Sequence, residues 1–357
     1  MQTGLTLQEL AGEIVTRAKS NSDILADNSQ ITSTHLGNSY DGYQHAIKVG
    51  DHTLRPNTVF EGQLSQKLRI PKTYYDRMAE EAPFLLDKNI NQWLHSDELR
   101  DRRRMIRTND INARAYLGAG YRHLDYVDVA ETVLPKLADM GLEIRSSNIT
   151  ERRMYMQAWS PKLEGEVKVG QVVRAGINIS DSEVGEGSLS IDNMIWILDC
   201  LNGQISGSVI RKTHAGRSSR HSPGVDIPVE QYMRDETRQL DDAAFFSKVR
   251  DAVEYALSPD VFETTLGKMR GAAEIKIAKP TKAVEVVTKQ LQLTKEEGES
   301  VLANLIEGGD LTKWGMANAV TALAHKSEDY DRAVAMEKAG TTVIDMPKSS
   351  WEDALAA

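Results

Sequence analysis

The chain has 357 residues, of which 40% are hydrophobic and 27% are charged, so it is long enough for one large or two modest globular domains. Its single cysteine, Cys200, excludes an intramolecular disulfide and a four-thiolate metal site, and this favours the cytoplasm as its compartment. The net charge of −9 argues against a protein that coats duplex DNA by bulk positive charge. Neither an export signal nor a long apolar stretch is found, so the sequence predicts a protein that does not contact the membrane.

Residues 1–98 are predicted to form a helical N-terminal segment. Thr6 and Glu9 have the spacing of a capping box, and apolar residues then recur at helical intervals. A polar, turn-rich stretch follows as far as Pro56. From Phe60 onward apolar residues repeat every four positions, which indicates further helices.

Residues 99–222 are predicted to form a central antiparallel sheet with a packed helix. Near Arg114 and Tyr116 the hydrophobic pattern has a period of two, with small apolar residues between these basic and aromatic ones. A helical pattern then ends at Gly141, a plausible C-cap, and strands resume. Asn202-Gly203 is a typical two-residue turn and predicts a hairpin of the strands on either side of it.

A second polar and aromatic strand face is predicted early in the sheet. Arg153, Tyr155 and Trp159 alternate with apolar residues, as Arg114 and Tyr116 do. The two faces together would give a sheet surface that is both basic and aromatic.

Residues 223–357 are predicted to be mainly α-helical, either as a separate region or as one compact unit with the sheet. Thr294 and Glu297 form another capping box, and Gly340 is predicted to end a helix. The expected fold class is therefore α+β, with a helical N-terminal segment, a central antiparallel sheet and a helical, acidic C-terminal half.

The positive charge is concentrated in two islands. Residues 100–122 contain seven arginines and two aspartates, and residues 204–221 contain four cations and no acid. Clustered cations of this kind bind phosphate groups. A solvated loop, or pairing of the islands with the acidic C-terminal half, is the competing explanation.

Several short segments resemble one known family. They lie between Phe60 and the C-terminus, and they are Lys67 to Pro71 before Tyr74-Tyr75, Asn89 to Trp93, Arg114 to Leu117 with Tyr121, Arg122 and Asp125, Asn178 to Gly185, Cys200 to Gly203, His214, and Trp314 with Asn318 to Thr321. These segments are similar to the domain-of-unknown-function family number 932, described as phage/plasmid-like proteins. The chain departs from that pattern at Asp181, where asparagine is expected, and at Gly118 to Gly120. The resemblance implies a mobile genetic element and, if a phage encodes the chain, the cytoplasm of the host cell.

The leading hypothesis is a nucleic-acid-binding protein of phage or plasmid recombination or replication that binds, and in one version anneals, single-stranded DNA. Single strands are held by cations along the backbone and by aromatic side chains that stack on bases. A homo-oligomer is included in this hypothesis. The predicted binding residues are Arg102, Arg103, Arg104, Arg107, Arg114, Tyr116, Arg122, Arg153, Tyr155, Arg211, Lys212, His214, Arg217 and Arg220.

Two alternatives stay open. The first is a non-enzymatic interaction protein that binds a host factor through the acidic C-terminal half, for host takeover or defence evasion, and burial of the basic sheet in salt bridges would favour it. The second, ranked last, is a metal-dependent phosphoesterase using His214, His221 and a carboxylate such as Glu183 or Asp199. No catalytic motif accompanies those histidines, so no catalytic residue, cofactor or metal ligand is predicted.

Overall fold

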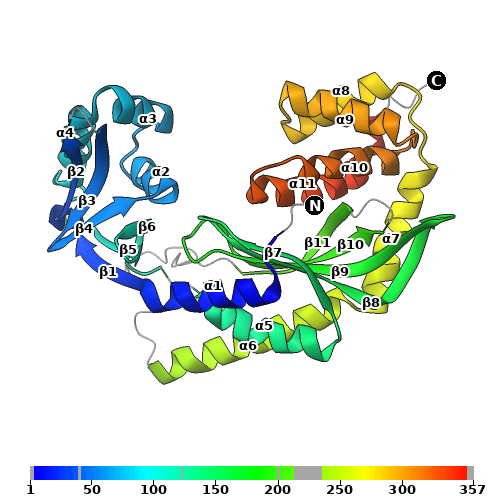
Figure 1. Ribbon diagram of the computed structural model, residues 1–357, viewed down its shortest axis with the longest axis horizontal. Coiled ribbons are helices and arrows are strands. Elements are labelled where there is room, and N and C mark those ends of the chain that lie inside the picture. The colour runs from blue at the N-terminus through cyan, green and yellow to red at the C-terminus, as the bar shows by residue number, and fades with distance from the viewer. Residues whose placement is uncertain (1–3, 39–41, 122–123, 199–201, 213–234, 352–357) are drawn as a thin grey trace, which may run out of the picture.

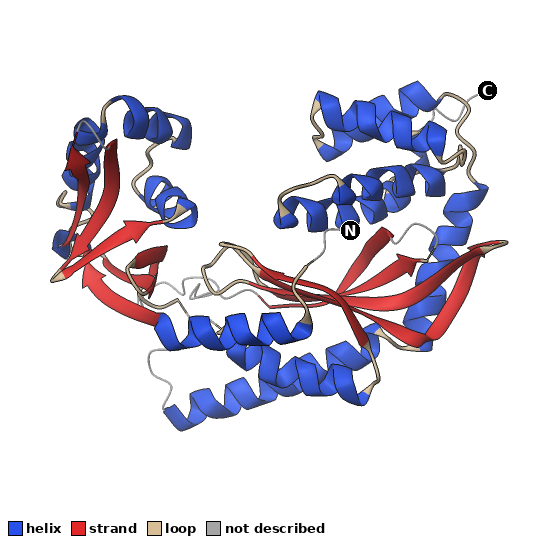
Figure 2. Cartoon of the chain, in the orientation of Figure 1, coloured by secondary structure: helices blue, strands red, loops and turns tan. Residues whose placement is uncertain are grey.

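The computed structural model describes residues 4–38, 42–121, 124–198, 202–212 and 235–351. Two sheets occupy the first two-thirds of the chain and helices make up the remainder, which confirms the α+β class. The molecule has two parts (Figures 1 and 2). We call the smaller part the arm and the larger part the body.

The body is built around a five-stranded antiparallel sheet with the order β11-β10-β9-β8-β7. Its strands are β7 (Glu143–Ile149), β8 (Met154–Lys168), β9 (Gln171–Asp181), β10 (Leu189–Ile197) and β11 (Asn202–Lys212). Strand β11 is an edge strand, and β10 is buried along its whole length.

The apolar face of this sheet carries the main core. Met154, Met156, Ile177 and Ile179 belong to one buried cluster with residues of the covering helices. Figure 1 shows α1 (Leu7–Ser20), α5 (Tyr126–Asp139) and α6 (Asp235–Ala256) below the sheet, and α7 (Pro259–Glu274) along β8. The predicted capping box of α1 and the positive φ of Gly141 after α5 are both present.

The opposite face is polar and aromatic, as the strand period predicts, but α11 (Tyr330–Asp345) covers part of it. Tyr155, Trp159 and Trp196 pack there with Tyr330 and Val334 of α11. The prediction of a polar-aromatic face is confirmed. Its side chains nevertheless lie inside the body, because a helix from the C-terminal region packs on them.

The C-terminal helices α8 (Pro280–Leu291), α9 (Lys295–Glu307), α10 (Lys313–Thr321) and α11 stack above the sheet (Figure 1). The capping box of Thr294 and Glu297 is confirmed. Gly340 does not end a helix: it lies inside α11, where an added Cβ would meet the Thr321 side chain of α10 at 2.4 Å. The glycine is there because two helices approach closely.

The predicted hairpin forms, but its turn lies elsewhere. Asn202 and Gly203 belong to β11, where they pair with Ile197 and Trp196 of β10. A Cβ on Gly203 would lie 2.8 Å from Met194 and 3.3 Å from the carboxylate of Glu337. Close packing beneath α11, rather than a turn, therefore accounts for this glycine.

The arm contains a six-stranded sheet with the order β1-β5-β6-β4-β3-β2. Its elements are β1 (Asn21–Asp27), β2 (Ile31–Asn38), β3 (Gly42–Val49), β4 (His52–Pro56), α2 (Thr58–Lys67), α3 (Lys72–Glu81), α4 (Pro83–Leu94), β5 (Arg103–Asn109) and β6 (Asn112–Gly118). Strands β4 and β6 pair in parallel and the other neighbours are antiparallel.

Residues 21–56, expected to be turn-rich, thus form four strands. Polar residues occupy core-facing positions of β2, which removes the hydrophobic alternation from the sequence. Ser33 and His35 are held by the carboxylate of Asp87 on α4, at 2.7 and 2.9 Å, and Ser33 also contacts His45. These hydrogen bonds offset the cost of burying polar groups.

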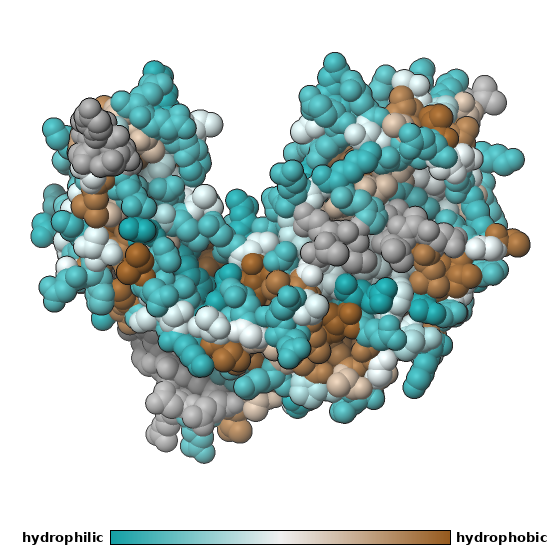
Figure 3. Space-filling view, viewed as in Figure 1, coloured by the Kyte–Doolittle hydropathy of each residue, from teal (hydrophilic) through white to brown (hydrophobic). Residues whose placement is uncertain are grey.

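Arm and body enclose an open cleft. Figure 3 shows the surface hollowed between the arm helices and the stacked C-terminal helices, with mostly hydrophilic residues on its walls. Helix α1 packs against α5 and β7 of the body although it precedes the arm in sequence. The chain therefore leaves the body after α1, builds the arm and returns at α5.

Candidate functional site

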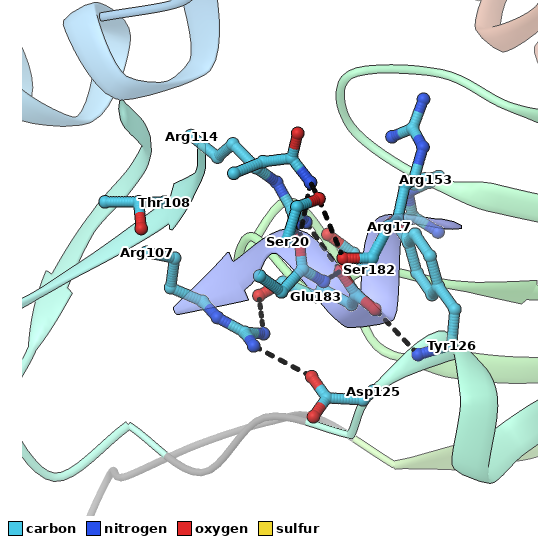
Figure 4. Close-up of polar contacts among 12 residues, drawn as sticks. Arg17, Ser20, Arg107, Thr108, Arg114, Asp125, Tyr126, Arg153, Ser182 and Glu183 are labelled. Carbon is cyan, nitrogen blue, oxygen red and sulfur yellow. Dashed lines mark hydrogen bonds and ion pairs between the residues drawn. The ribbon is translucent and has the colours of Figure 1, made fainter. Parts of the chain in front are cut away.

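A buried group of charged residues joins the arm to the body; we call Asn21, Arg107, Arg114, Asp125 and Glu183 the junction cluster (Figure 4). Glu183, 2% exposed, follows β9, and one of its oxygens accepts a 2.5 Å hydrogen bond from Arg114 of β6. Its other oxygen accepts the backbone N–H of Tyr126, in the first turn of α5, at 2.7 Å. Glu183 therefore ties a strand of the arm to the helix at which the chain re-enters the body.

Arg107 of β5 completes the cluster. It donates to Asp23 at 2.9 Å, to Asp125 at 2.8 Å and to the backbone carbonyl of Glu183 at 2.9 Å. Burial alone would lower the pKa of Arg107, but the carboxylates of Asp125, Asp23 and Glu183 outweigh it and raise the pKa. The guanidinium is charged, and its Nε, Nη1 and Nη2 atoms each donate one of these hydrogen bonds, so Arg107 holds the junction.

Further contacts fix the loop after β9. The Gln63 side chain of α2 donates to the backbone carbonyl of Val184 at 2.7 Å, and the loop packs on Leu117 and Tyr121 beside β6. The arm, this loop and the body are thereby held in one geometry, and the cleft does not have to form on binding.

On the other side of this loop is a polar recess that we call the cation pocket, lined by Arg153, Tyr155, Ser188, Ser190, Asp192, Ser206, Ser208, Asp331 and Lys338, among others. Its volume is about 450 Å³. The side chains come from the start of β8, from β10 and β11, and from α11. Hydroxyl and cationic groups thus meet at one end of the body sheet.

Of the two cations that line the pocket, Arg153 uses the smaller share of its side-chain hydrogen-bond donors, and its charge is unpaired within the described residues. One of its N–H groups donates to the carbonyl of Glu186 at 2.9 Å, and it forms no ion pair among the described residues. A Cβ added to Gly187 would lie 1.4 Å from the guanidinium, so any larger residue here would displace Arg153 from this position. Figure 4 shows Arg153 directed away from the junction cluster. A guanidinium has five N–H donors, so several remain for a ligand.

The two carboxylates of the pocket are already bonded. Asp192, 3% exposed, accepts from Ser190 at 2.5 Å and Asn178 at 3.0 Å, and pairs with Lys338 at 3.0 Å. Tyr155 donates its hydroxyl to Asp331 at 2.8 Å. Burial, with the Asp331 charge, raises the pKa of Tyr155, so the phenol keeps its proton.

The described part of the second basic island is the end of β11. In the sheet register, the backbone of Arg211 lies opposite Ser190, which lines the pocket, and that of Lys212 lies opposite Leu189. Arg153, Tyr155, Arg211 and Lys212, all predicted binding residues, are therefore brought to one end of one sheet.

The residues of the first basic island, residues 100–122, lie in two different environments. Arg107 and Arg114 lie in the junction cluster, where both side chains are buried and their charges are paired with carboxylates. Tyr116 is fully buried and donates to Asn28, with Arg104 half-buried over its ring at 5.3 Å. Three predicted binding residues, Arg107, Arg114 and Tyr116, are therefore buried, and the basic and aromatic face predicted for the strand of Arg114 and Tyr116 is covered.

Tyr155 is likewise 4% exposed beneath α11. Arg102 and Arg103 are exposed at the start of β5. Arg122, His214, Arg217 and Arg220 lie outside the described residues, as do Cys200 and, from the phosphoesterase hypothesis, Asp199 and His221.

Sequence reasoning missed Lys338, Asp192 and the serine hydroxyls of the pocket. Lys338 lies in an ordinary amphipathic helix, and nothing in its neighbourhood indicates that it reaches the sheet. The Ser188, Ser190, Ser206 and Ser208 set was a possible signal, because alternate serines on two neighbouring strands give a hydroxyl-lined face.

Among the described residues, no group of three or more histidine, cysteine, aspartate or glutamate side chains is arranged to hold a metal ion. Within the same residues, no helix combines the length and apolar character needed to span a bilayer.

Comparison of the chain with models of protein families, with curated proteins and with solved structures finds no match. The resemblance described from the sequence motifs stays a prediction.

Proposed function

We propose that this protein binds single-stranded nucleic acid, with the sugar-phosphate backbone of the strand in the cation pocket. The observation that carries the proposal is that Arg153, Lys338 and several serine hydroxyls line one recess at one end of the body sheet. Arginine, lysine and serine side chains are common donors to phosphate oxygens.

The size of the pocket favours a single strand. A recess of about 450 Å³ is comparable to a small-ligand site and admits a nucleotide unit, but a duplex cannot enter it. The pocket adjoins the loop that the junction cluster fixes, so the site is preorganised and little ordering cost is expected on binding.

The test is fluorescence anisotropy with labelled single- and double-stranded DNA 12-mers at several salt concentrations. We expect salt-dependent binding that is tighter for the single strand. Arg153→Gln should weaken it about tenfold and reduce the slope of log affinity against log salt by about one. Arg211→Ala with Lys212→Ala should do the same or more.

Arg77→Gln is the matched control, because Arg77 is exposed on α3, pairs with Glu81 and loses the same charge. Equal effects of Arg153→Gln and Arg77→Gln would refute the site. If the wild type does not bind either DNA at low salt, the interaction-protein interpretation gains. That interpretation places the partner on the acidic C-terminal half, and the half-exposed Phe84, Leu85 and Trp93 of α4 are a second apolar surface to test.

A further inference from the structure

A second recess, the side pocket, lies against the cation pocket and has a volume of about 410 Å³. It lies between β10 and β11, α7 and α11, and it shares Ser206, Gly207, Ser208 and Thr341 with the cation pocket. The two pockets therefore adjoin along β11 and α11, and the side pocket also carries the charged residues Asp260, Lys268 and Asp345.

Two buried polar atoms in the wall of the side pocket have no hydrogen-bond partner among the described residues. They are the Oε1 atom of Gln204, a residue with 0% exposure, and the Oγ atom of Ser206, a residue 8% exposed. The amide of Gln204 is fixed, because its Nε2 atom donates to Thr341 at 3.2 Å. Unpaired buried polar atoms cost about 1–3 kcal/mol each and are rare in folded proteins.

The rest of the side pocket is suited to a neutral, flat ligand. Met269 and Ile344 give it apolar walls, and Tyr255, 61% exposed, also lines it. The charged groups Lys268 and Asp345 pair with each other at 3.2 Å. The side-chain amide of Asn193 donates a hydrogen bond to the Thr265 hydroxyl at 3.0 Å.

We infer that the side pocket receives a nucleobase of the strand whose backbone occupies the cation pocket. This inference rests on the proposed function. A base supplies the N–H group that Gln204 Oε1 requires, a partner for the Ser206 hydroxyl, and a ring face for Tyr255. The ligand class is a nucleobase with a ring or exocyclic N–H donor, attached to phosphate.

The experiment compares two labelled 12-mers with equal charge, one carrying bases and the other an abasic sugar-phosphate chain, by anisotropy at one salt concentration. Gln204→Met removes the unpaired acceptor and keeps the side-chain volume. Gln290→Met, at an exposed position of α8, is the control. Thermal unfolding of each variant without DNA is measured in parallel.

We expect the wild type to bind the base-carrying strand about tenfold more tightly than the abasic strand, as for one or two hydrogen bonds. Gln204→Met should bind both strands alike, with the affinity of the abasic strand, and its Tm should change little, because removal of an unpaired buried acceptor offsets the lost hydrogen bond to Thr341. Gln290→Met should retain the wild-type preference.

Two results would overturn the inference and can be told apart. If the wild type binds both strands equally, or Gln204→Met keeps the preference, there is no base pocket but the cation pocket stands. If the wild type binds neither strand, the proposed function fails and the base pocket fails with it.

Discussion

Replacing Glu183 with alanine should uncouple the arm from the body. Glu183 is 2% exposed and accepts hydrogen bonds from Arg114 and from the Tyr126 backbone. Its removal leaves the guanidinium of Arg114, 8% exposed, without its carboxylate, and the Tyr126 N–H without an acceptor. Breaking a buried ion pair on one side costs about 3–5 kcal/mol, so we expect a loss of that size in the free energy of unfolding.

The assay is urea unfolding followed by tryptophan fluorescence, with single-tryptophan variants that assign each transition. Trp93 lies in the arm, whereas Trp159, Trp196, Trp314 and Trp351 lie in the body. In the wild type the arm and body signals should coincide. In Glu183→Ala the arm signal should change at lower urea than the body signal, because the link between them is broken.

Glu151→Ala is the control. Glu151 also joins body and arm, through a hydrogen bond from Thr58 at 2.8 Å, but it is exposed, and a loss below about 1 kcal/mol is expected. The double variant Glu183→Ala with Arg114→Met is a further check. Its loss in the free energy of unfolding should be at least about 1 kcal/mol smaller than the sum of the two single losses, because no unpaired buried charge remains. A loss below about 1 kcal/mol for Glu183→Ala, or strict additivity, would refute the role of the cluster.

Two further predictions concern the body sheet. Burial raises the pKa of Glu337 to about 7, although a hydrogen bond from Gln157 acts in the opposite direction. Because the folded state holds this proton more tightly than the unfolded state, the contribution to stability is complete below pH 4.5 and is lost as the pH rises to about 7. Glu337→Gln should therefore flatten the pH profile of urea unfolding and add about 3 kcal/mol above pH 7, whereas parallel profiles would contradict the burial argument. Gly176→Ala should cost about 1–3 kcal/mol in thermal unfolding, because the added Cβ would lie 2.6 Å from the ring of Trp196; an unchanged Tm would show that the strand shifts freely.

The body could be largely predicted from the sequence because its pattern is simple. Both capping boxes, the helix before Gly141 and the strand alternation at Arg153 and Tyr155 are signals of three to seven residues. Such signals depend on neighbours in the chain, so no knowledge of the tertiary fold is needed. The four strands of residues 21–56 lack them, because Ser33 and His35 take core-facing positions.

The candidate site could be predicted only in part. Strand composition singled out Arg153 and the end of β11, but it could not separate Arg153 from Arg114. Both arginines belong to alternating sequence patterns, Arg114 within β6 and Arg153 directly before β8. The difference is that Glu183 lies beside Arg114, whereas among the described residues no carboxylate pairs with Arg153. That difference depends on contacts between residues 69 positions apart in the chain, which period and composition do not report.

The position of α1 has a consequence for how the chain folds during synthesis. Leu10 and Ile14 of α1 belong to one buried cluster with residues of α5 and the body sheet, more than a hundred positions later. All strands of the arm, by contrast, are complete at Gly118. During synthesis the strands of the arm are therefore complete before the residues that cover the apolar stripe of α1 have been made. Until the ribosome has passed β7, that stripe is the part of the nascent chain most exposed to misassociation or to a chaperone.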